Sequence, residues 1–299
     1  MENRFDNSAS WIILSPIEQS IKRKIEAIGT PLKDWDVKIY RGILTGYNDA
    51  FIIDGKKKDE LIAADPKSAE IIRPILRGRD IKRYSYEFAN LYIIATFPSK
   101  MYNIDDYPAV KKYLLSFGIE RLEQTGKTYR LNGTTIKARK KTTNKWFETQ
   151  DSLSYWDDFS KQKIVWGNLC LSAQYAYIEN EVFINAPSAL IVGGNKYLLA
   201  LLNSKVVDWY IRQLGVSRNG GYFEYKPMFI EQAPIPIASK KIQDKIEWLV
   251  DKLLALYPNN AIEKELDNIV FSLYDLSSEE IAFLDSKPET KAISSSENE

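Results

Sequence analysis

The stretch "RGILTGYNDAFIID", residues 41–54, places two glycines and several turn-forming polar residues between two apolar runs. Gly42 and Gly46 permit backbone angles or close approaches that a side chain forbids, and Asn48 and Asp49 favour turns. We therefore expect a tight turn between two strands. One interpretation is a hairpin turn that only joins the strands. The other is a loop that rests against a phosphate and presents donors from Arg41, Thr45, Tyr47 and Asn48.

Outward from this turn, residues 36–194 consist of short β-branched and aromatic runs separated by Gly, Asn and Pro, which is typical of strands. One helix is expected there, over residues 109–117. Helical spacing of apolar residues also predicts helices over 15–29, 197–214 and 242–257, and capping boxes begin at Ser15 and Ser277. Pro234 and Pro236 predict an extended connector. The expected fold is α+β, a mixed, sheet-rich domain followed by a helical C-terminal segment.

This pattern divides the chain into four parts. Residues 1–35 are expected to form an N-terminal linker and helix, 36–237 the sheet-rich domain, and 238–285 the helical segment. Residues 286–299 are polar and are expected to be disordered.

Composition excludes several kinds of chemistry. The 299 residues contain 41 basic and 40 acidic side chains, no histidine and one cysteine, Cys170. Histidine-based catalysis, histidine metal sites and internal disulfides are therefore excluded. The chain has no Gly-x-Gly and no P-loop. No apolar run approaches the roughly 20 residues that cross a bilayer, and residues 1–10 lack a signal-peptide core. These features favour a cytoplasmic protein with no membrane partner.

Positive charge is concentrated in the middle of the chain. Seven basic residues and no acidic one lie between Gln124 and Phe147, among Thr, Asn and Gly, and Trp146 follows directly. This composition suits phosphate contacts combined with reading of base edges. A second basic cluster surrounds Gly78 in "IIRPILRGRDIKRY". The alternatives are a solvated basic face for the first cluster and surface ion pairs with Asp80 for the second.

Two further groups of residues each allow a functional and a plainer interpretation. Asp208 with "EYK", residues 224–226, is the nearest approach to a metal-dependent nuclease site, although acid-x-Lys triplets are common by chance. Trp209, Tyr210 and Trp248 could form a stacking platform, but they fall on apolar faces of expected helices and are better explained as core.

Seven blocks, in order and spacing, resemble one known family. They are "LKDWDVKIYRGILTGYNDAFIID", "DPKSAEIIRPILRGRDIKRY", "YPAVKKYLLSF", "ARKKTTNKWFETQ", "KYLLALLNSKVVDWYIRQ", "YKPMFIEQAPIPI" and "ELDNIVFSLYDLSSEEI". From about residue 11 to 284 the chain is similar to the TaqI-like C-terminal specificity domain of type IIG restriction-modification enzymes, which follows an adenine-specific DNA methyltransferase. The methyltransferase tetrapeptide of that family, Asn or Asp followed by two prolines and an aromatic residue, is absent.

The resemblance implies a binding protein that reads double-stranded DNA, with residues 36–237 as the target-recognition domain. Catalysis, S-adenosylmethionine and Mg²⁺ are expected only in a catalytic domain or subunit that partners this chain. The stretch "LLALLNSK" followed by "PIPI" also resembles the end of a recognition domain in type I specificity subunits, where the next helix packs on a partner. Residues 242–257 are therefore expected to dock the partner. A scaffold, a type I-like specificity subunit and a nuclease or methyltransferase fragment stay open as alternatives. The expected DNA-binding residues are Arg41, Thr45, Tyr47, Asn48, Arg77, Arg79, Lys82, Lys127, Arg130, Lys137, Arg139, Lys140, Lys141, Lys145, Trp146, Ser217, Arg218, Asn219 and Tyr222.

Overall fold

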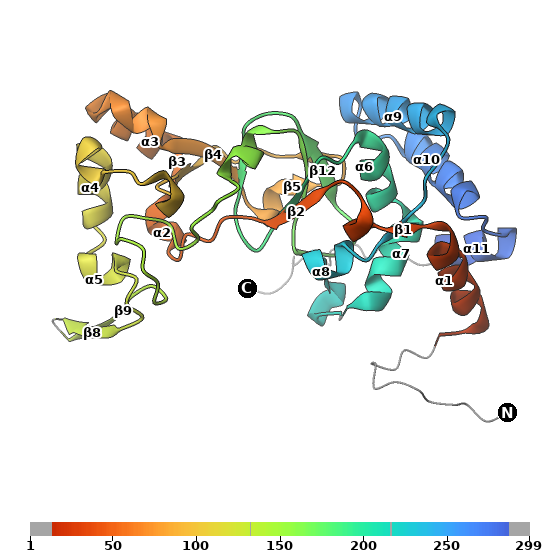
Figure 1. The fold of residues 1–299 in the computed structure, drawn as a ribbon, viewed down its shortest axis with the longest axis horizontal. Coiled ribbons are helices and arrows are strands. Elements are labelled where there is room, and N and C mark those ends of the chain that lie inside the picture. Colours follow the sequence, from red (N-terminus) through yellow and green to blue (C-terminus); the bar gives the residue numbers. More distant parts are fainter. Residues whose placement is uncertain (1–13, 132, 216, 287–299) are drawn as a thin grey trace, which may run out of the picture.

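The structure, a computed structural model, describes residues 14–131, 133–215 and 217–286. Figure 1 shows an elongated molecule with a lobe of helices and strands at one end, a helical lobe at the other and a sheet between them. The described part of the chain begins and ends in the helical lobe, where α1 (Pro16–Ile28) contacts α11 (Ser278–Ser286). The expected disordered tail lies outside the described residues, apart from Ser286.

The central sheet has the order β12 (Tyr175–Ile178), β10 (Lys163–Trp166), β14 (Ala189–Val192) and β2 (Lys38–Arg41), and all its pairs are antiparallel. Alternate residues enter two different cores because side chains alternate across a strand. Ile164 and Trp166 pack toward the helical lobe, whereas Val165 packs toward the outer sheet. The buried sheet therefore joins the two ends of the molecule.

The outer sheet has the order β13 (Phe183–Ile184), β4 (Ile72–Leu76), β7 (Leu91–Ile94) and β3 (Ile52–Asp54). Only the β13–β4 pair is parallel. Four helices accompany this sheet in the lobe opposite the helical end, and Figure 1 shows them in orange and yellow. They are α2 (Asn48–Phe51), α3 (Gly55–Ala64), α4 (Pro108–Leu115) and α5 (Ile119–Leu122).

The stretch 41–54 connects the two sheets, because β2 belongs to the central sheet and β3 to the outer one. The hairpin interpretation is therefore wrong. The amide of Gly42 donates to the carbonyl of Ser188 at 2.6 Å, and that of Ile43 donates to Ile184 at 2.7 Å. A Cβ on Gly42 would lie 2.5 Å from the Ile184 carbonyl oxygen. The chain thus crosses between the sheets at a point where only glycine fits.

Helices α6 (Lys196–Asn203), α7 (Lys205–Leu214), α9 (Lys240–Ala255) and α10 (Asn260–Leu273) complete the helical lobe. The single helix expected over 197–214 is interrupted at Ser204, whose hydroxyl accepts from the amide of Val207 and caps α7. Asn203 holds this break in place, since its side-chain amide exchanges two hydrogen bonds with the backbone of Tyr175. A tertiary contact therefore divides a stretch that has continuous helical spacing.

The structure confirms some of the other predicted elements and changes others. The capping boxes at Ser15 and Ser277 are confirmed, as are the helix near 109–117 and the α+β class. Helix α3 was not predicted; it begins at Gly55 after Asp54, whose carboxylate accepts from the amide of Lys57 at 2.7 Å. The proline connector holds a short helix, α8 (Pro227–Ile230), and only then becomes extended in β16 (Pro234–Ile235), which pairs with β1 (Thr30–Pro31).

The division of the chain at residues 35, 237 and 285 stays a prediction. In the part of the chain that the structure describes, every helix is too short or too polar to cross a bilayer.

Candidate nucleic-acid interface

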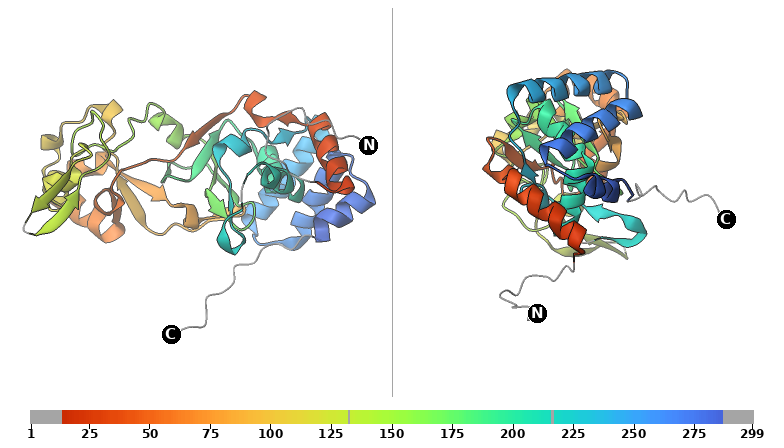
Figure 2. Two further views of the ribbon diagram at one scale, coloured as in Figure 1. Left: turned by 90° about the horizontal axis from the view of Figure 1, so that it is seen from below. Right: turned by 90° about the vertical axis from the view of Figure 1, so that its right-hand side faces the viewer.

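A two-stranded antiparallel ribbon, β8 (Thr128–Leu131) and β9 (Thr134–Lys137), lies at the end of the molecule opposite the helical lobe. Figures 1 and 2 show it as an outlying element of that lobe. Gly133 takes a positive φ of 76° in the connecting turn, a conformation that glycine adopts without strain. The ribbon carries the first part of the basic cluster that the sequence indicates.

Six basic residues of the cluster are exposed, and none of them forms an ion pair with a residue that the structure describes. They are Lys127, Arg130, Lys137, Lys140, Lys141 and Lys145. Arg41 and Arg218 are exposed as well, but they pair with Asp151 and Glu224 at 2.8 Å. The strongest uncompensated positive charge among the expected DNA-binding residues therefore lies on the ribbon and the segment after it.

Arg139 is the exception in this cluster, because its side chain is only 2% exposed. Its guanidinium donates to four backbone carbonyls, those of Leu122, Thr45, Glu148 and Trp146, at 2.6–2.9 Å. Burial lowers the pKa of Arg139 to about 10, a change that the nearby Glu148 carboxylate opposes. This position corrects the prediction of a DNA contact, since Arg139 ties the segment after the ribbon to the turn at 41–54.

The opening turn uses most of its donors internally. Thr45 is buried, and its hydroxyl donates to the side-chain oxygen of Asn48 at 2.7 Å and accepts from the amide of Tyr47. Thr45 is therefore also corrected from a DNA contact to a structural residue. Tyr47 is half-buried beneath the Arg121 guanidinium, which lies 4.2 Å from the ring centroid. Asn48 stays exposed.

Arg121 was missed by the sequence analysis. Besides covering Tyr47, it donates to the carbonyl of Lys137 at the end of β9. Together with Arg139 it fastens the base of the ribbon to the opening turn. No local sequence pattern predicts this role, because the two partners of Arg121 are 74 and 16 residues away in the chain.

The second basic block forms a compact turn around Gly78. Arg77 makes a bidentate ion pair with Asp80, with N–O distances of 2.9 and 2.8 Å. Burial by itself raises the pKa of the Asp80 carboxyl, but the Arg77 hydrogen bonds bring the net pKa below its ordinary value. Arg77 therefore organises the turn, whereas Arg79 is exposed and Lys82, half-buried, caps the carbonyl of Arg79.

The loop after α7 presents Ser217, Arg218, Asn219 and Tyr222 to solvent. The amide of Arg218 donates to the carbonyl of Tyr222 at 2.6 Å, which closes the loop. In Figure 1 this teal loop and the β8–β9 ribbon both lie along the lower side of the molecule. Trp146 is half-buried and packs edge-on against Phe147.

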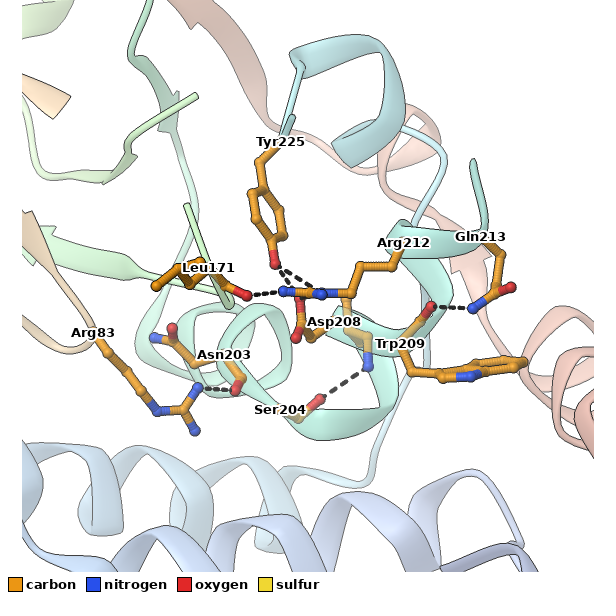
Figure 3. A network of polar contacts seen from close by, with 10 residues as sticks. Arg83, Leu171, Asn203, Ser204, Asp208, Trp209, Arg212, Gln213 and Tyr225 are labelled. Carbon is orange, nitrogen blue, oxygen red and sulfur yellow. Dashed lines mark hydrogen bonds and ion pairs between the residues drawn. The ribbon is translucent and has the colours of Figure 1, made fainter. Parts of the chain in front are cut away.

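Asp208 and Glu224, the residues considered for a nuclease site, are both engaged. Figure 3 shows Asp208 between Tyr225 and Arg212. Its carboxylate accepts from the Tyr225 hydroxyl at 2.6 Å and from Arg212 Nε at 3.4 Å. Glu224 pairs with Arg218 and Lys226. Across residues 14–131, 133–215 and 217–286, no group of three or more acidic or cysteine side chains could hold a metal ion.

The aromatic residues considered as a platform separate into two kinds. Trp209 and Tyr210 are buried in the core of the helical lobe, which confirms the plainer interpretation. For Trp248 that interpretation is wrong, because 53% of its side chain is exposed on α9, where Lys252 lies over the ring.

Comparison with known proteins gives consistent results. The TaqI-like C-terminal specificity domain matches residues 73–235. The type II methyltransferase M.MjaIV of Methanocaldococcus jannaschii is 23% identical over 251 residues, which cover 79% of this chain and 78% of that protein.

Two solved structures share the fold. The type IIL restriction-modification enzyme MmeI, in complex with DNA, has a TM-score of 0.58 at 14% identity, over 85% of this chain and 35% of that enzyme. The type IIG restriction endonuclease BpuSI has a TM-score of 0.51 at 16% identity, over 87% and 33%. The chain thus spans about a third of each enzyme.

Proposed function

This chain belongs to the family of TaqI-like C-terminal specificity domains, and on that premise we propose that it recognises a specific sequence in double-stranded DNA for a type II restriction-modification enzyme. In this proposal the chain is a binding protein and not a catalyst. An adenine-specific methyltransferase outside the chain modifies the recognised site.

The observation that carries the proposal is the exposed basic cluster on residues 127–145. Its six cations have no carboxylate partners among the described residues, so they are available to phosphates. A DNA backbone would supply those phosphates, and neutralising them releases condensed counterions, which favours binding at low salt. An interaction scaffold gives no reason for such a concentration of unpaired charge on the ribbon and the segment after it.

Selection from a randomised duplex-DNA library tests the proposal. The purified chain is incubated with the library at moderate salt, and the retained duplexes are sequenced. We expect one short enriched motif that contains an adenine. A chain that retains no duplex DNA contradicts the proposal and supports the scaffold instead.

The salt dependence of binding tests the role of the lysines. If four of the basic residues contact phosphates, log affinity falls against log salt with a slope of about −3.6. Lys140→Ala combined with Lys141→Ala removes two of these contacts and makes the slope less steep, at about −1.8. The matched control replaces Lys241 and Lys264, two exposed lysines of the helical lobe, and leaves the slope unchanged. A slope near zero for the unaltered chain refutes phosphate contact.

Catalysis and its cofactors are assigned to the partner. S-adenosylmethionine would serve methyl transfer and Mg²⁺ would serve cleavage there, whereas this sequence has no pair of adjacent prolines for the methyltransferase tetrapeptide. Calorimetric titration of the chain with S-adenosylmethionine is expected to give no binding heat. Mg²⁺-dependent DNA cleavage that is lost in Glu224→Ala would support the enzymatic alternative.

The partner is proposed to dock on the outer side of α9. The apolar stripe of this helix, which includes Ile246 and Leu253, is already buried within the helical lobe, so it is not available to a second chain. Trp248 and Leu256 stay exposed on the same helix or at its end. Trp248 is the proposed anchor of this contact, because tryptophan is enriched among the residues that carry binding energy at protein interfaces.

A further inference from the structure

The β8–β9 ribbon has two chemically different faces. Strand register pairs Thr128 with Lys137 and Arg130 with Thr135, and these four exposed polar residues lie on one face because alternate residues of a strand share a side. Tyr129 and Ile136 lie on the other face. The Tyr129 hydroxyl donates to Glu123, next to α5, at 2.7 Å. At the Tyr129–Ile136 pair this second face therefore looks back at the protein, and the cationic face looks away from it.

The cations of the ribbon lie at different distances from the turn at its tip. Lys127 precedes β8, whereas Arg130 is three residues further toward the turn at Gly133, a distance of about 10 Å along an extended strand. The major groove of B-DNA is about 8.5 Å deep and about 12 Å wide, which admits a two-stranded ribbon. If the lysines at the base of the ribbon meet phosphates at the groove rim, the Arg130–Thr135 pair is the part that reaches the base edges.

The chemistry of this pair differs from that of the lysines around it. A lysine ammonium is a point charge that suits a phosphate, whereas the planar guanidinium of arginine can donate two parallel hydrogen bonds. In the major groove guanine presents two acceptors, O6 and N7, that match this fork. Arg130 forms no ion pair with a described residue, and the hydroxyl of Thr135 lies directly across the ribbon. Arg130 is the only arginine in the two strands.

We propose that Arg130 is a specificity-determining residue that reads a guanine in the major groove, with Thr135 beside it, while Lys127, Lys140 and Lys141 hold the phosphates. This assignment deepens the proposed function and rests on it. It divides one basic cluster into a base-reading pair and a set of phosphate-binding lysines.

The test compares the full chain with two variants in the library selection. Arg130→Gln replaces the guanine-reading fork with an amide that matches adenine N6 and N7. Leu131→Gln is the matched control, because it places the same side chain one residue further along β8 and on the opposite face. The folded state of each variant is checked by chemical denaturation, and affinities are then measured for the selected duplex and for single-base changes in it.

We expect Arg130→Gln to lose the preference for guanine at one position of the motif, by about 5- to 150-fold, and to favour adenine there. Leu131→Gln keeps the original motif. An unchanged motif in Arg130→Gln overturns the assignment but leaves the proposed function standing. Duplex binding by the unaltered chain with no preferred sequence, or no duplex binding at all, overturns both this assignment and the proposed function.

Discussion

Replacing Arg139 by Met is expected to destabilise the lobe that carries the ribbon. Methionine is about as long as the aliphatic part of arginine but donates no hydrogen bonds. The carbonyls of Leu122, Thr45 and Trp146 lose their only hydrogen-bond donor among the described residues, whereas that of Glu148 keeps the Gln124 side chain at 3.1 Å. At about 2 kcal/mol for each buried carbonyl left unpaired, the loss is about 6 kcal/mol.

Part of that loss is recovered, because the guanidinium is itself unfavourably buried. Its pKa is about 10, compared with the ordinary value of 12.5, and this difference corresponds to about 3 kcal/mol. The net expectation is a decrease of about 3 kcal/mol in the free energy of unfolding. The charge is present at neutral pH in both states, so this difference should not vary between pH 6 and 8.

Urea denaturation measures the change in unfolding free energy, and hydrogen exchange of the ribbon amides shows where it acts. Lys140→Met is the control, since it introduces the same side chain at the neighbouring exposed position. Faster exchange in residues 128–137 is expected only in the Arg139 variant. DNA binding by that variant is compared with the unaltered chain, since Lys140 is itself a proposed phosphate contact, and it should weaken because fewer molecules hold the ribbon in its binding position. Equal stability and equal exchange in the two variants would refute the role given to Arg139.

Three further changes have definite expected outcomes. Gly42→Ala should lower the free energy of unfolding by about 2 kcal/mol in denaturant titrations, because its Cβ would meet rigid backbone at 2.5 Å; a change under about 0.5 kcal/mol contradicts this. Burial by itself raises the pKa of Glu280, but hydrogen bonds from Lys24 and other donors bring it to about 2. Its contribution to the free energy of unfolding, about 3 kcal/mol, is therefore present above pH 4.5 and lost as pH falls toward 2. Glu280→Gln should therefore have a lower free energy of unfolding than the unaltered chain at pH 7 but not at pH 2. A constant difference over this range argues against the assignment. Trp248→Glu should leave unfolding free energy within about 0.5 kcal/mol but weaken binding of the catalytic partner in pull-down titrations; unchanged partner binding removes α9 as the docking site.

Local pattern was sufficient for much of the helical structure. The Ser15 and Ser277 capping boxes and the apolar stripe of α9 depend on residues three or four positions apart, so they can be read directly from the chain. The basic cluster was visible for the same reason, because its residues are neighbours in sequence. The sequence did not predict helix α3, because its hydrophobic periodicity is weak and its start is marked by only one hydrogen bond, to the Asp54 carboxylate.

Only the tertiary structure could divide the basic cluster. Arg139 and Lys140 are adjacent and have similar intrinsic chemistry, yet one is buried among four carbonyls and the other is exposed. That difference arises from Thr45 and Leu122, which approach from other parts of the chain. Likewise, the turn at 41–54 has the composition of a hairpin, but its role as a crossing between two sheets depends on the backbone of residues 184–188.

The amino-acid sequence by itself determined the class of fold, the family and the concentration of positive charge, because each is recorded in the order of nearby residues. The tertiary structure decided which of those charges face solvent, which face of the ribbon carries Arg130, and which side chains of α9 stay exposed. These depend on contacts between distant segments, where burial costs a charge its hydration unless other parts of the chain supply hydrogen bonds in its place.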